Sequence, residues 1–271
     1  MRRILQFAVL CLGAGVLTAC TPDTVVETED IPTAGVRFVN AVPDTFAVDF
    51  RPVDIVENST FYGVAFRSTT LLAYKNARAG SRHFRIFQSG TTPEIASVVV
   101  KDTTVNLEAG KRYTFVLWGY ARAGSSPARR LTVLEDSPAD PGAQIAFRVV
   151  NATDAAIDTR VYPNGGTVPS AATWSGVAAL SASNYVNVAV GRTNINVQPA
   201  GGGTAIVNTE CTQRGLAGSV DIEAAPGTEI AGSALSAIIV PRSVAGSTAP
   251  NLTTPGLICV WDRRPPRAPG V

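Results

Sequence analysis

The chain has 271 residues, of which 45% are hydrophobic and 16% charged, with 23 Lys and Arg against 21 Asp and Glu. Two of the basic residues lie in the N-terminal leader, so the remaining chain is formally neutral and nothing favours nucleic acid as a partner. A single histidine, His83, excludes a multi-histidine metal centre. We therefore expect no metal and no cofactor.

Residues 1–19 are predicted to be a signal peptide. Two arginines precede an apolar run over residues 4–16, which glycines interrupt and which is too short to span a bilayer. The run ends in Leu17-Thr18-Ala19-Cys20, which resembles the bacterial lipobox. The resemblance implies cleavage before Cys20, lipidation of that residue and export. The alternative is an ordinary secretory signal followed by an accidental cysteine.

Residues 20–33 are predicted to form a short acidic tether between the lipid and the first domain. The residue after the cysteine is Thr21 and not aspartate, which favours the outer membrane over the cell membrane. The expected location is thus a lipid anchor in one of these membranes, with the globular part in the periplasm or on the cell surface.

Two stretches 111 residues apart have nearly the same sequence. Arg37 to Ala41, followed by Asp49, is repeated as Arg148 to Ala152, followed by Asp158. A repeat at a fixed spacing indicates one structural unit built twice. We predict two domains, residues 34–137 and 143–262, joined by a short linker with two prolines.

Two further pairs of segments support the repeat. Gly80 to Ile86 corresponds to Gly191 to Val197, and Leu131 to Asp136 corresponds to Leu257 to Asp262. The spacing grows from 111 to 126 residues for the last pair, which predicts an insertion in the second copy between about Val197 and Leu257.

The chain between tether and tail is predicted to be all-β. Residues 82–88 alternate between apolar and polar side chains, and residues 113–118 are a β-branched and aromatic run without a breaker. Turn residues recur about every ten positions, so each copy should be an antiparallel β-sandwich of immunoglobulin-like type. Glu108 to Phe115 resembles a tyrosine corner built on Tyr113. Residues 263–271 form an Arg/Pro tail that we expect to be disordered.

The first copy resembles a known family. Val36 to Asp44, then Val48-Asp49, Ala79-Gly80 and Val105 to Thr114, are similar to the domain-of-unknown-function 4397 family of bacterial exported proteins and lipoproteins. The second copy keeps less of the pattern. Since the family has no agreed activity, the resemblance implies an architecture and a location.

The mature chain would contain one pair of cysteines, Cys211 and Cys259, because Cys11 leaves with the leader and Cys20 carries the lipid. In an oxidising compartment this pair is expected to form a disulfide, the alternatives being a thiol nucleophile or a metal site. The repeated Asp49 and Asp158 suggest a structural role common to both copies, either pairing with Arg37 and Arg148 or accepting backbone hydrogen bonds.

The residue inventory gives little support to an enzyme. A nucleophilic triad would have to use His83, which is expected to be a partly exposed strand residue, and glycoside chemistry would need two acids across a cleft from the set Asp44, Asp49, Asp54 and Glu57. No catalytic residue is therefore assigned.

We expect a non-enzymatic binding or spacer module that contacts the membrane through its lipid anchor, with an envelope protein or glycan as candidate partner. The alternative is a carbohydrate-binding module whose stacking platforms would come from the aromatic residues Tyr62, Tyr74, Trp118, Trp174 and Tyr185.

Overall fold

The computed structural model describes residues 30–219 and 221–266. The chain divides into two units, residues 1–31 and 32–271, and every described strand belongs to the second. The expected signal peptide, Cys20 and most of the tether lie outside the described residues, as do the last five residues of the tail. In the described part of the chain, no helix is long and apolar enough to cross a membrane.

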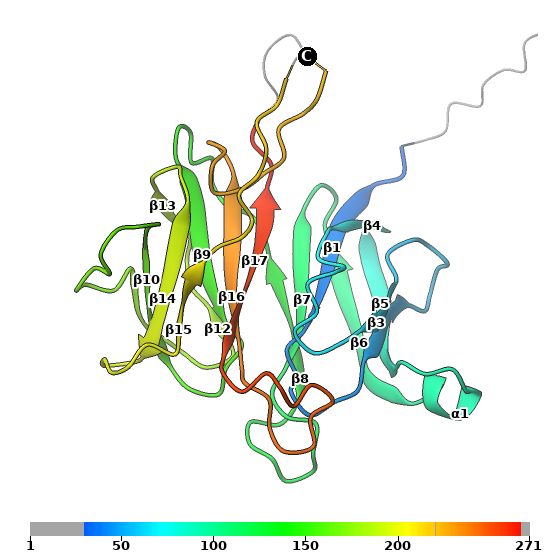
Figure 1. Cartoon of the computed structure of the whole chain (residues 1–271). Coiled ribbons are helices and arrows are strands. Elements are labelled where there is room, and N and C mark those ends of the chain that lie inside the picture. The colour runs from blue at the N-terminus through cyan, green and yellow to red at the C-terminus, as the bar shows by residue number, and fades with distance from the viewer. Residues whose placement is uncertain (1–29, 220, 267–271) are drawn as a thin grey trace, which may run out of the picture. The chain divides into compact units, whose positions relative to one another are not determined.

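The described chain is nearly all β-structure, arranged in four sheets (Figure 1). Its one short helix, α1, spans Pro93–Ala96. The first two sheets have the orders β4-β1-β7-β8 and β3-β2-β5-β6. Their strands are β1 (Thr33–Asn40), β2 (Val48–Pro52), β3 (Phe61–Val64), β4 (Lys75–Arg78), β5 (Gly80–Gln88), β6 (Val99–Leu107), β7 (Arg112–Trp118) and β8 (Arg130–Glu135).

The other two sheets have the orders β12-β9-β16-β17, with β13 also paired to β9, and β11-β10-β14-β15. Their strands are β9 (Ile145–Asn151), β10 (Ile157–Pro163), β11 (Trp174–Val177), β12 (Ser181–Ala182), β13 (Val186–Val188), β14 (Thr193–Pro199), β15 (Val207–Glu210), β16 (Ala234–Val240) and β17 (Gly256–Arg263). We call strands β1 to β8 the first sandwich and strands β9 to β17 the second sandwich.

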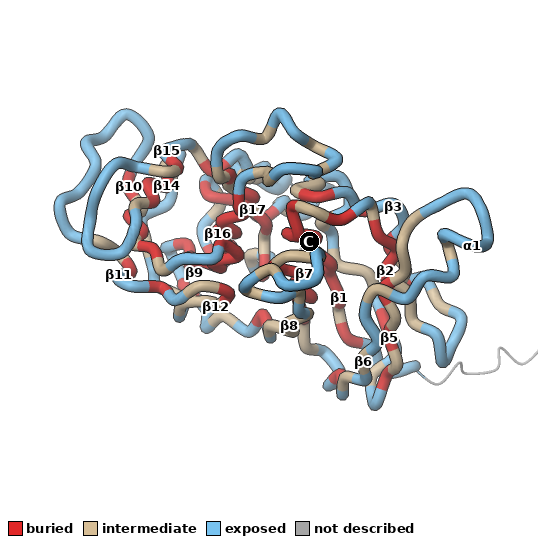
Figure 2. Tube along the Cα trace, turned by 90° about the horizontal axis from the view of Figure 1, so that it is seen from below, coloured by how far each residue is buried: buried red, intermediate tan, exposed pale blue. Residues whose placement is uncertain are grey.

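In each sandwich the two sheets pack face to face over an apolar core. In the first, the Phe50 ring lies 4.9 Å from the rings of both Phe38 and Phe84, measured between centroids, and also 4.9 Å from the ring of Phe115. These four rings come from both sheets, so they fix the distance between the sheets. Buried residues follow the strands, and the connecting loops are mostly exposed (Figure 2).

The two sandwiches have the same strand order. In both, a parallel pair occupies the middle of one sheet, β1 with β7 and β9 with β16. The link before the second strand of this pair differs: it comprises residues 108–111 in the first sandwich and residues 211–233 in the second. This longer link lies within the region where the sequence predicts an insertion.

The predicted strands at residues 82–88 and 113–118 fall within β5 and β7. The hydroxyl of Tyr113 accepts a hydrogen bond from the backbone N–H of Glu108 at 3.1 Å, which is the contact that a tyrosine corner requires. The last strand extends to Arg263, one residue into the predicted tail.

Candidate functional site

The two sandwiches pack against each other through the outer faces of the sheets that contain β1 and β9. A third apolar cluster fills this contact, with members on both sides. From the first sandwich come Val39, Ala41, Val116 and Trp118, and from the second come Val150, Ala152, Leu180, Ile238, Val240, Ile258 and Val260. We call this contact the junction. It leaves β1, β7, β9 and β16 covered on both faces.

Four charged residues are buried in the junction. The Arg37 guanidinium donates through Nη2 to Asp262 Oδ1 at 2.6 Å and through Nη1 to the carbonyl oxygen of Trp261 at 2.7 Å. The Arg148 guanidinium donates through Nη2 to Asp136 Oδ1 and through Nη1 to the carbonyl oxygen of Glu135. Each arginine therefore binds the aspartate that belongs to the other sandwich.

Hydroxyl groups complete the set of contacts. Arg37 Nε donates to Thr114 Oγ1 at 3.1 Å, and that hydroxyl donates to Asp136 Oδ2 at 2.6 Å. In the second sandwich, Arg148 Nε donates to Ser236 Oγ at 2.7 Å, and that hydroxyl donates to Asp262 Oδ2 at 2.6 Å. The contacts of one half are thus repeated in the other.

Two tyrosines close the cluster. Tyr74 donates to Asp136 Oδ2 at 2.6 Å, and Tyr185 donates to Asp262 Oδ2 at 2.9 Å. Each ring also lies against the nearby guanidinium, with the Cζ atom of Arg37 4.4 Å from the centre of the Tyr74 ring. These tyrosines lie 111 residues apart in the chain, at the spacing of the sequence repeat.

Burial decides the protonation behaviour of this cluster. It raises the pKa of Asp136, and the neighbouring Asp262 carboxylate adds to that effect, whereas Arg37 and Arg148 oppose it. Burial also raises the pKa of Tyr74 and that of Tyr185. The two tyrosine hydroxyls consequently stay protonated and donate hydrogen bonds. The charges of the two arginines balance those of the two aspartates.

Of the two structural roles expected for the repeated aspartates, pairing with Arg37 and Arg148 is wrong, and acceptance of backbone hydrogen bonds is confirmed. The arginines point to the junction, whereas the aspartates lie in β2 and β10, which belong to the other sheet of each sandwich. Asp49 instead accepts the N–H of Gly63 at 2.8 Å, and Asp158 accepts the N–H of Gly176 at 2.7 Å.

These glycines have φ of +61° and +60°, in the left-handed region that favours glycine. In both sandwiches the aspartate lies where the register between neighbouring strands shifts. The repeated aspartate therefore holds a β-bulge, and its N–H acceptor role explains why it occurs twice.

The repeated asparagines have a structural role as well. Asn40 Nδ2 donates to the Val64 carbonyl oxygen at 3.0 Å, and Asn151 Nδ2 donates to the Val177 carbonyl oxygen at the same distance. Each side chain thereby ties the end of β1 or β9 to a strand of the opposite sheet. All the residues of the repeated motif that carry polar side chains are thus part of the framework.

The predicted disulfide between Cys211 and Cys259 is present, with Cα atoms 5.6 Å apart. It connects the first residue of the long link to β17, and so attaches the insertion to the sheet that forms the junction.

The acids considered for glycoside chemistry do not meet in one cleft. Asp44 accepts the backbone N–H groups of Ala121 and Arg122, and Asp54 and Glu57 pair with Arg82. His83 is half-exposed, and its Nε2 lies 2.6 Å from Asp102 Oδ1. Within residues 30–219 and 221–266, no group of three or more His, Cys, Asp or Glu side chains could hold a metal ion.

The aromatic residues considered as glycan platforms do not form one surface. Trp118 and Trp174 are buried, and Tyr74 and Tyr185 donate to the junction aspartates. Tyr62 is the member of the set with a mostly exposed side chain.

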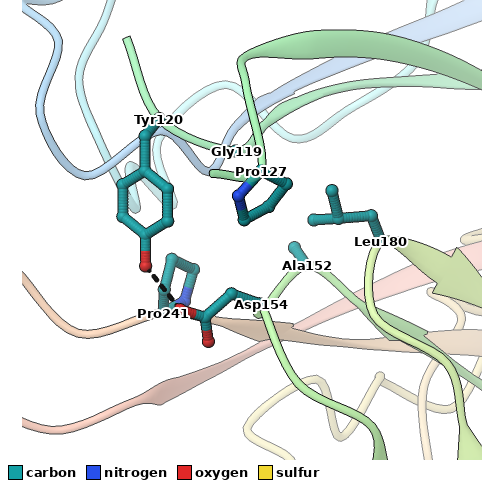
Figure 3. A pocket seen from close by; sticks show the side chains of 7 residues that line it. All are labelled: Gly119, Tyr120, Pro127, Ala152, Asp154, Leu180 and Pro241. Atoms are coloured by element: carbon teal, nitrogen blue, oxygen red, sulfur yellow. Dashed lines mark hydrogen bonds between the residues drawn. The ribbon is translucent and has the colours of Figure 1, made fainter. Parts of the chain in front are cut away.

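A small hollow lies where loops of the two sandwiches meet (Figure 3). Its cavity volume is about 10 Å³, and Tyr120 donates across it to Asp154 Oδ2 at 2.7 Å. It is lined by Gly119, Tyr120, Pro127, Ala152, Asp154, Leu180 and Pro241. Ligand pockets usually measure about 300 Å³ or more, so this hollow fits the packing of two loops better than the binding of a ligand.

Sequence reasoning missed Asp136, Asp262 and the hydroxyl residues of the junction. A signal for the aspartates was present, since they end the two segments that repeat at a spacing of 126 residues. Their partners could not be read from the chain because the contact runs between sandwiches.

Residues 34–162 match the family model described as a domain of unknown function, DUF4397. The matched region supports the family resemblance for the first sandwich and extends to β10 of the second. No curated protein matches the chain.

Proposed function

We propose that the protein is an exported lipoprotein in which two copies of an immunoglobulin-like sandwich form one rigid, non-enzymatic binding or spacer module at the cell envelope. The lipobox at residues 17–20 supports the anchor. The repeated motif, the common strand order and the similar bulges support two copies of one domain.

The junction carries the proposal of a rigid module. Two ordinary domains on a linker would move relative to each other. Here an apolar cluster and four buried charges join the two sandwiches. Separation of the sandwiches would take Asp262 away from Arg37 and Arg148 away from Asp136. A fixed relation between domains suits a protein that holds a surface at a set distance from a membrane.

The anchor is tested by expressing the full chain and the Cys20→Ala variant in a bacterial host with lipoprotein processing. We expect the first to carry acyl chains on Cys20, by mass spectrometry, and to fractionate with membranes, and the variant to lack both. Equal release of both proteins from the membrane fraction would contradict the anchor.

The role of the module is tested by affinity capture of envelope partners with the lipidated protein, using Cys20→Ala as the control. Specific recovery of a protein or glycan would identify a binding module. Recovery of nothing specific would favour a passive spacer.

A further inference from the structure

One loop of the first sandwich presents aliphatic side chains to solvent although it is firmly held. Residues 53–60 connect β2 to β3, and we call them the clamped loop. Val53 and Ile55 are 39% and 37% exposed, and Val56 is fully exposed. Exposed apolar side chains that lie together mark candidate interaction surfaces.

A buried arginine holds this loop in place. Arg82 Nε and Nη2 each donate to Asp54 at 3.0 Å, and Nη1 donates to Glu57 Oε1 at 2.8 Å, while the Arg82 side chain is itself only 2% exposed. The hydrogen bonds from Arg82 lower the pKa of Asp54. Both acids of the loop are therefore neutralised by contacts within the protein.

The clamped loop lies next to the point at which the N-terminal chain joins the fold. Glu57 Oε2 accepts the backbone N–H of Arg78, and Arg78 pairs with Thr33 at the start of β1. The N–H of the next residue, Ala79, donates to the carbonyl oxygen of Pro32. The clamped loop therefore contacts β4 at the point where β4 pairs with the start of β1, and the segment that leads to Cys20 joins the fold at that point.

The reach of that segment limits where the loop can be. Cys20 lies twelve residues before Pro32, which corresponds to about 40 Å for a fully extended chain and less for any other conformation. A lipid on Cys20 therefore keeps this end of the first sandwich close to the bilayer.

We infer that the clamped loop contacts the membrane surface, with Val53, Ile55 and Val56 in the lipid interface, and so orients the module on the bilayer. This rests on the proposed lipid anchor. Aliphatic side chains gain free energy in the interface, and an ordered loop loses little entropy on contact. Tyr62, which is 62% exposed at the start of β3 and lies 5.2 Å from the Arg51 guanidinium, adds an amphipathic ring near the headgroups.

The test uses the full lipidated protein with one introduced thiol. Since Cys20 carries the lipid and Cys211 is bonded to Cys259, a Val56→Cys variant can be labelled there with an environment-sensitive fluorophore. The matched control is Val98→Cys, an exposed aliphatic residue (45%) that precedes β6 at the opposite end of the first sandwich. Both are bound to phosphatidylethanolamine–phosphatidylglycerol vesicles that contain lipid brominated in the acyl chain.

We expect quenching by the brominated lipid to be at least about twofold greater at position 56 than at position 98. Ile55→Asp, added to Val56→Cys, should reduce the quenching to the level of the control. Equal quenching at both positions, on vesicles that carry the lipidated protein, would overturn the inference alone. Protein that is not lipidated, and does not float with the vesicles, would overturn the proposed anchor and the inference with it.

Discussion

Arg37 and Arg148 are buried charges that make hydrogen bonds across the junction, to the other sandwich. Each guanidinium has a hydroxyl acceptor within its own sandwich and a carboxylate and a carbonyl acceptor on the other. A buried ion pair adds little stability compared with well-packed apolar residues, but removing one partner leaves an uncompensated charge. The cluster therefore specifies which face each sandwich buries.

Asp262→Asn is expected to lower the free energy of unfolding by about 3–5 kcal/mol, because Arg37 loses the nearer of its two carboxylate partners in a buried site. The measurement is denaturation by urea. Asp102→Asn, which removes an exposed pair with His83 and Arg85, is the control and should lower the free energy of unfolding much less. Similar losses in the two variants would show that the junction charges are not important for stability.

Tyr120 gives a pH-dependent prediction. Burial, and then its hydrogen bond to Asp154, raises the pKa of Tyr120 to about 12 from an ordinary value of 10.0. The folded protein holds this proton more tightly than the unfolded chain does. The contribution of the protonated hydroxyl to the free energy of unfolding is therefore complete below pH 10 and is lost as the pH rises towards 12.

The free energy of unfolding should accordingly fall more between these pH values in the native protein than in Tyr120→Phe, and the phenolate absorbance of Tyr120 should appear near pH 12. Identical pH profiles for the two proteins would mean that Tyr120 is freely solvated.

At the scale of elements, the two sandwiches differ in the link that precedes the second strand of the parallel pair. The four-residue turn of the first sandwich is held by non-covalent contacts, among them the hydrogen bonds from Glu108 N–H to the Tyr113 hydroxyl and from Gly110 N–H to the Thr33 carbonyl oxygen. The long link of the second is fixed at its start by the disulfide and at its end by Gly232, whose N–H donates to the Gln144 carbonyl oxygen. The longer loop thus has covalent support that the shorter one lacks.

Replacing both Cys211 and Cys259 with alanine is expected to lower the free energy of unfolding by about 4 kcal/mol, since the cysteines are 48 residues apart and the bond restricts the unfolded chain. Urea denaturation of the variant should match that of the reduced native protein. A variant as stable as the oxidised native protein would contradict this role.

Individual strands could be predicted because their signal is local. Alternation over residues 82–88 and the apolar run at residues 113–118 lie within one strand each, and the cysteine pairing followed from the number of thiols. The run at Tyr113 to Trp118 carried a further signal, because a strand that is apolar on both faces is covered on both faces. The strands that cover its outer face, β9 and β16, lie far away in the sequence, so no local pattern could identify them.

The misassigned pairs have the same cause. Arg37 and Asp49 are close in sequence and of opposite charge, yet alternation and the change of sheet place their side chains on different surfaces. The clamped loop was also missed, because its Asp54 and Glu57 were considered as catalytic acids and their partner Arg82 was not.

For residues 32–271 as a whole, the junction predicts a single cooperative unit. The apolar cluster between the sandwiches contains residues from both, so unfolding one sandwich would expose the outer face of the other. Calorimetry should show one transition in which the calorimetric and van't Hoff enthalpies agree. Two resolved transitions would show that the sandwiches are independent.

The position of Asp262 in the chain has a consequence for biosynthesis. Arg37 is made 225 residues before this partner, which belongs to the last strand. Until β17 is complete, Arg37 lacks Asp262, and the carboxylate that remains near it is that of Asp136, at 3.7 Å in the structure. A chain truncated before Asp262 lacks this pair permanently, so the contact between Arg37 and Asp262 distinguishes finished molecules from fragments.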